Sequence, residues 1–78
     1  MPTVLREKGF RFYFYSHEPN EPPHVHVDKG GASAKFWLQT GGVASATGFS
    51  AHDLAALHRL VRERRMKLLE AWHDFFGT

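Results

Sequence analysis

Two histidines lie two positions apart in residues 21–27, which read Glu-Pro-Pro-His-Val-His-Val. The β-branched Val25 and Val27 favour a strand, in which alternate side chains point to the same face. We therefore expect His24 and His26 on one face, with Cα atoms about 6–7 Å apart. At this spacing the two imidazoles could bind one metal ion, act as an acid and a base, or contact a partner. The residues alone leave these three alternatives open.

An acid–base reaction would use the two imidazoles on a phosphodiester. One imidazole would take a proton from an RNA 2′-hydroxyl while the other protonates the leaving oxygen. A cation, Lys35 or Arg11, would stabilise the phosphate charge, and a tyrosine, Tyr13 or Tyr15, would orient it. The candidate catalytic residues under this hypothesis are His24, His26 and Lys35.

A metal site at His24 and His26 would need a third protein ligand. The loop and the following strand end could supply one if the loop folds back, and the candidates are His17, Glu18, Glu21 and Asp28. The chain contains no cysteine, which excludes a disulfide framework and a thiolate zinc site. We expect no cofactor, with zinc or another divalent metal as the alternative.

The first half of the chain alternates as an antiparallel sheet does, with turns at Lys8-Gly9 and at residues 29–31. Residues 39–48 are rich in Gly, Ala and Ser, with only a brief extended piece at Val43-Ala44. The pattern predicts a meander of four strands, at Thr3–Glu7, Phe10–Tyr15, His24–Asp28 and Ser33–Leu38.

A helical region is predicted to begin at Ser50. Ser50 as N-cap and Asp53 three residues later approximate a capping box, and Phe49 can pack on Leu54. Apolar residues then follow helical spacing, and Gly77 marks the end. The stripe weakens at residues 63–65, so one bent helix and two abutting helices both fit. The sequence thus predicts a single small α+β domain over residues 1–78.

The strand alternation separates two sets of side chains. One set is apolar and is expected beneath the helix: Phe10, Phe12, Phe14, Val25, Val27, Ala34, Phe36 and Leu38. The other set would form a face that one helix cannot cover, which we call the open face: Arg11, Tyr13, Tyr15, His24, His26, Lys35 and Trp37. Exposed aromatic patches mark contact sites, and aromatic-plus-basic surfaces can bind nucleic acid. The candidate binding residues are Arg11, Tyr13, Tyr15 and Trp37.

Composition limits the class of protein further. The formal net charge is only +2, too small to require a nucleic-acid partner. No apolar run nears the roughly 18 residues of a membrane span, and no basic start leads into an apolar stretch. We expect a soluble cytoplasmic protein without a membrane partner. The chain also lacks a nucleophile elbow, a Walker loop and a dinucleotide glycine fingerprint.

Several segments together resemble the prokaryotic family called domain of unknown function 4160. These segments are residues 1–5, 21–27, 34–38, 48–50 and 69–73, and His24, His26, Lys35 and Trp37 match the family's pattern. The resemblance implies a small stand-alone protein encoded beside another short open reading frame, as in a toxin–antitoxin-type pair.

The leading hypothesis is therefore a toxin–antitoxin-type component whose open face binds RNA or a cognate partner protein from an adjacent gene. The alternative is a non-enzymatic binding or regulatory module that forms homo-oligomers through the same face. A metal-dependent hydrolase is the third hypothesis, so the sequence leaves open whether the protein is an enzyme.

Overall fold

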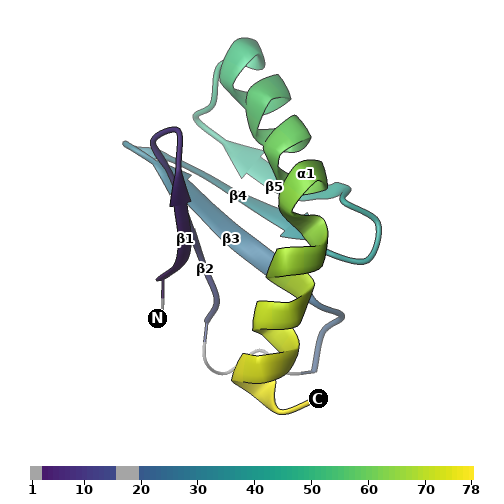
Figure 1. The fold of residues 1–78 in the computed structure, drawn as a ribbon. Helices are drawn as coiled ribbons and strands as arrows, with labels where there is room; N and C mark the ends of the chain where they lie inside the picture. Colours follow the sequence, from purple (N-terminus) through teal and green to yellow (C-terminus); the bar gives the residue numbers. More distant parts are fainter. Residues whose placement is uncertain (1–2, 16–19) are drawn as a thin grey trace.

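The computed structural model describes residues 3–15 and 20–78, which form one antiparallel sheet and one long helix (Figure 1). The strands follow one another in space as they do in sequence, so the sheet is a meander of five strands. The elements are β1 (Thr3–Glu7), β2 (Phe10–Tyr13), β3 (His24–Lys29), β4 (Ala32–Trp37), β5 (Val43–Thr47) and α1 (Ala51–Phe76). The predicted α+β class is confirmed.

The predicted number of four strands is wrong, because residues 43–47 form a fifth. The short extended piece expected at Val43-Ala44 continues to Thr47 and pairs with β4. All five side chains of β5 are exposed and small, so the segment has no apolar alternation to reveal a strand. Pairing with the neighbouring strand, rather than burial, gives it this conformation.

Helix α1 is continuous, which decides between the two helical alternatives left open by the sequence. The Ser50 Oγ accepts a hydrogen bond of 3.0 Å from the Asp53 backbone N–H, as the capping pattern predicts. At the other end Gly77 adopts φ 71°, a left-handed conformation that ends the helix. No helix among the described residues combines the length and apolar character that crossing a bilayer requires.

The core lies between α1 and one face of the sheet (Figure 1). Every member of the predicted apolar strand set is buried, including Phe12 and Phe36, neither of which is exposed to solvent. From the helix, Leu57, Val61 and Leu68 pack against them. Burial of this set stabilises the domain and fixes the phase of β2, β3 and β4, which places the alternate residues of these strands on the opposite face.

An ion pair joins the first strand to the helix. Arg64 donates two hydrogen bonds to the Glu7 carboxylate, at 2.9 Å from Nε and 2.8 Å from Nη2. This bidentate geometry is the strongest form of the arginine–carboxylate contact. It fixes β1 against the middle of α1.

Candidate functional site

Strand register brings the predicted site residues together on the side of the sheet away from the helix. Tyr13 pairs with His26, and His26 pairs with Lys35, so these three form a row across β2, β3 and β4. Arg11 pairs with Asp28 on one side of this row, and His24 pairs with Trp37 on the other. All seven predicted open-face residues contribute to this cluster, although they are not equally accessible.

His26 occupies the centre of the open face and is partly exposed. Its ring stacks on Tyr13, with centroids 5.6 Å apart and planes inclined at 24°. The Tyr15 ring meets it edge-on at 4.4 Å. The two tyrosines therefore hold the His26 imidazole in one orientation.

Tyr13 is buried, contrary to the expectation that it would be displayed. Its side chain is 5% exposed, because Tyr15 and His26 flank its ring and the Arg11 guanidinium lies 4.5 Å above the ring centre. Its hydroxyl donates a hydrogen bond of 3.1 Å to Asp28 Oδ1. The side chains of the open face thus pack against one another and bury some of their own members.

Burial raises the pKa of Tyr13 well above its ordinary value of 10.0, and hydrogen bonds with Tyr15 and Asp28 raise it further. A phenol in this environment keeps its proton throughout the physiological pH range. Tyr13 can therefore donate a hydrogen bond but cannot act as a general base.

His24 is also buried, with 1% of its surface exposed, although parity predicted a surface position. The β2–β3 ladder ends at the pair Tyr13–His26, so His24 lies beyond the last residue of β2. There its ring contacts Trp72 of α1, with centroids 5.0 Å apart, as well as His26 at 5.2 Å and Trp37 at 5.9 Å. No sequence pattern indicated the contact with Trp72, because strand alternation places His24 on the side of the sheet away from the helix that carries Trp72.

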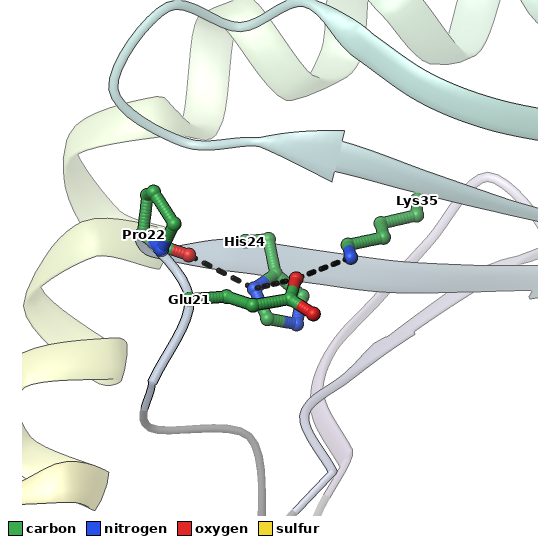
Figure 2. A network of polar contacts seen from close by, with 4 residues as sticks. All are labelled: Glu21, Pro22, His24 and Lys35. Carbon is green, nitrogen blue, oxygen red and sulfur yellow. Dashed lines mark hydrogen bonds and ion pairs between the residues drawn. The ribbon is translucent and has the colours of Figure 1, made fainter.

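Polar contacts fix the protonation pattern of His24 (Figure 2). Its Nδ1 lies 2.9 Å from the Pro22 carbonyl oxygen, which can only accept, so Nδ1 carries the hydrogen. In the neutral ring the lone pair is then on Nε2. The Glu21 carboxylate lies between His24 and Lys35, with Oε1 3.9 Å from Nδ1 and 2.5 Å from the Lys35 Nζ.

Two of the cations on this face have carboxylate neighbours. Lys35 forms an ion pair with Glu21 and also lies 4.7 Å above the Trp37 ring, while Arg11 lies opposite Asp28 in the register of β2 and β3. Arg6 of β1 lies opposite Arg11 on the same face and is exposed, so it adds a third cation at the β1 edge.

The two further candidate ligands within the described residues already have polar partners. Glu21 contacts Lys35 and Asp28 accepts from Tyr13, while His17 and Glu18 lie outside the described residues. Across residues 3–15 and 20–78, no three His, Asp or Glu side chains gather as a metal ion would need. Metal binding by His24 and His26 therefore remains a prediction.

A family model described as a domain of unknown function (DUF4160) matches residues 9–73, which include the whole open face and most of α1. The chain belongs to the DUF4160 family. This membership confirms the resemblance seen in the sequence, and the family's description names no activity. No curated protein and no solved structure gave a significant match.

Proposed function

We propose that this DUF4160 protein is one component of a toxin–antitoxin-type pair and binds its cognate partner protein through the open face. The observation that carries the proposal is a set of aromatic and imidazole rings already packed in fixed orientations, with Tyr15, His26 and Trp37 partly exposed. Rigid Tyr and Trp side chains are typical anchors of protein interfaces. Fixing them beforehand lowers the entropy lost on binding.

The carboxylate neighbours of Lys35 and Arg11, the two cations beside the aromatic rings, favour a protein partner over RNA. Affinity for RNA depends on an excess of Lys and Arg that neutralises phosphates. Here Glu21 pairs with Lys35, and Asp28 lies opposite Arg11. The two cations also lie over the rings of Tyr13 and Trp37, where a base would have to stack. An RNA ligand would have to displace both.

A second candidate function is acid–base chemistry on RNA, and the fixed tautomer of His24 favours it. Because Nδ1 donates to Pro22, the ring orientation and the position of its lone pair are set before a substrate arrives. His24 is buried, so His26 would be the imidazole that reaches a substrate, and His24 would position it. His26 would take the proton from the 2′-hydroxyl as that oxygen bonds to phosphorus, and its imidazolium form would give the proton to the leaving oxygen as the old phosphorus–oxygen bond breaks. Lys35, the cross-strand neighbour of His26, would stabilise phosphate charge.

One set of variants separates the two functions. Trp37→Ala removes a partly exposed anchor, His26→Ala removes the accessible imidazole, and Met66→Ala is a control on α1, where Met66 is 69% exposed. We expect Trp37→Ala to weaken affinity for the neighbouring gene product by more than about 2 kcal/mol and Met66→Ala to leave it unchanged. Calorimetric titration measures both.

RNA cleavage by the same purified, partner-free proteins completes the test. The binding function predicts no cleavage by the unmodified protein. Cleavage that falls about 10²–10⁴-fold in His26→Ala, with a bell-shaped pH profile, would establish the acid–base function instead.

A further inference from the structure

The two edges of the sheet differ in how they are protected from further pairing. β1 has a register irregularity between Thr3 and Leu5, an exposed Arg6, and Glu7 bound to Arg64. Charges of this kind discourage a second strand from joining an edge, whereas a register irregularity occurs in both edge strands. β5, the other edge strand, has neither a charged residue nor a proline, and all five of its side chains are exposed.

β5 is also paired on one side only within the described chain. Its inner side pairs with β4, and no described residue pairs with its outer side. The outward N–H and C=O groups of such a strand are able to pair with another chain. This uncharged edge is therefore the part of the sheet best suited to extension.

We propose that two copies of the chain pair through β5, antiparallel, about a twofold axis beside Ala46. The register irregularity lies at the Val43 end, whereas Ser45, Ala46 and Thr47 follow β4 regularly. Centring the axis on this regular segment places Ala46 opposite its own equivalent and Ser45 opposite Thr47. These side chains are small and uncharged, so nothing repels across the axis, and Ser–Thr pairs can hydrogen-bond across strands.

The resulting dimer has a definite geometry. A twofold axis perpendicular to the sheet keeps both helices on one side and both open faces on the other. The two open faces then belong to one continuous sheet surface. The inference stands on the β5 edge and does not depend on the proposed function of the open face.

Opposite charges at Ala46 test the pairing. In Ala46→Lys and in Ala46→Glu, two like charges would meet at the axis, so each variant alone should raise the dimer dissociation constant by about tenfold or more. An equimolar mixture should restore the dimer, because unlike charges then meet. Ser33→Lys, at an exposed position of β4, is the matched control and should remain dimeric.

Sedimentation equilibrium measures these constants, and circular dichroism verifies that each variant is folded. Unmodified protein that stays monomeric at its highest soluble concentration would overturn the inference. Dimers that persist in both charged variants would overturn it as well.

A cysteine at the same position gives a second, uncharged test. The chain contains no cysteine, so a single introduced thiol can form a disulfide only with the same position of a second copy. Residues directly opposite in an antiparallel pair have Cα atoms about 4.5–5.5 Å apart, within the range a disulfide spans. Ala46→Cys should therefore form a covalent dimer under mild oxidation and Ser33→Cys should not. Equal crosslinking of the two variants would contradict β5 pairing.

Discussion

At the scale of single residues, the open face contains both buried and accessible members. Tyr13 and His24 are interior to the layer, whereas Tyr15, His26 and Trp37 reach the surface. Substitutions at the first two report on packing as well as on function. Substitutions at the other three report mainly on what the face binds.

His24→Ala should destabilise the domain more than His26→Ala. The first change removes a buried ring packed against Trp72 together with its hydrogen bond to the Pro22 carbonyl, and losses of this kind cost about 1–3 kcal/mol. The second removes a partly exposed ring. Urea unfolding of both variants gives the two free energies. Equal and small losses would show that the Pro22 contact and the Trp72 packing contribute little to stability.

At the scale of elements, two tethers position the sheet relative to α1. One is the ion pair between Glu7 of β1 and Arg64. The other is the connection from β5 to α1, in which Gly48 has φ +87° and lies close to Ala32. We therefore expect changes at Glu7 and at Gly48 to alter the stability of the domain.

The Glu7 tether makes stability depend on pH. The hydrogen bond from Arg64 lowers the pKa of Glu7 below its ordinary value of 4.5. A lowered pKa means that the folded state favours the charged carboxylate, so the stabilisation is present above pH 4.5 and is lost as the pH falls through the folded value. Glu7→Gln should therefore lose less stability on acidification than the unmodified protein.

Urea unfolding at neutral pH and below pH 4.5 measures this difference, with Glu70→Gln on the exposed side of α1 as the control. Added salt should reduce the effect, because Arg64 is 38% exposed and the pair is screened. A Glu7→Gln variant with the same acid dependence as the unmodified protein would exclude the ion pair as its source.

Gly48→Ala should destabilise the β5–α1 connection by about 1–3 kcal/mol. The positive φ disfavours a side chain, and an added Cβ would lie 3.2 Å from the Ala32 Cα, a backbone atom that cannot move aside alone. Gly30→Ala is the control: it has φ +60° but no described atom within 4 Å of the added Cβ. Thermal unfolding should show the larger loss for Gly48→Ala, and equal losses would mean that the close approach has no effect.

Local signals account for what the sequence predicted of these elements. The two-residue period assigned Phe12 and Phe36 to the core, and the Ser50 cap located the start of α1. The sequence did not predict β5, because its small, exposed side chains show no alternation of apolar and polar residues. The burial of His24 was not predicted, because it depends on a tertiary contact with Trp72 beyond the end of β2. No local sequence pattern around His24 indicates this contact.

In the molecule as a whole, α1 covers one face of the sheet, and no described element covers the other (Figure 1). We propose partner binding at the open face and self-association at β5. These surfaces are separate, so Trp37→Ala should leave the β5 dimer intact, while Ala46→Lys should leave partner affinity per chain unchanged.

Binding of the cognate partner by the open face can be followed in a nuclear magnetic resonance titration with the product of the adjacent open reading frame. The chain has two tryptophans, so two indole N–H signals report on opposite sides of the sheet. Trp37 is partly exposed on the open face, and Met66 and His73 lie exposed on the outer surface of α1. We expect the Trp37 indole signal to shift or broaden on binding while the amide signals of Met66 and His73 stay unchanged. Perturbation of those helix amides with an unchanged Trp37 signal, or no binding at all, would contradict the proposed binding face.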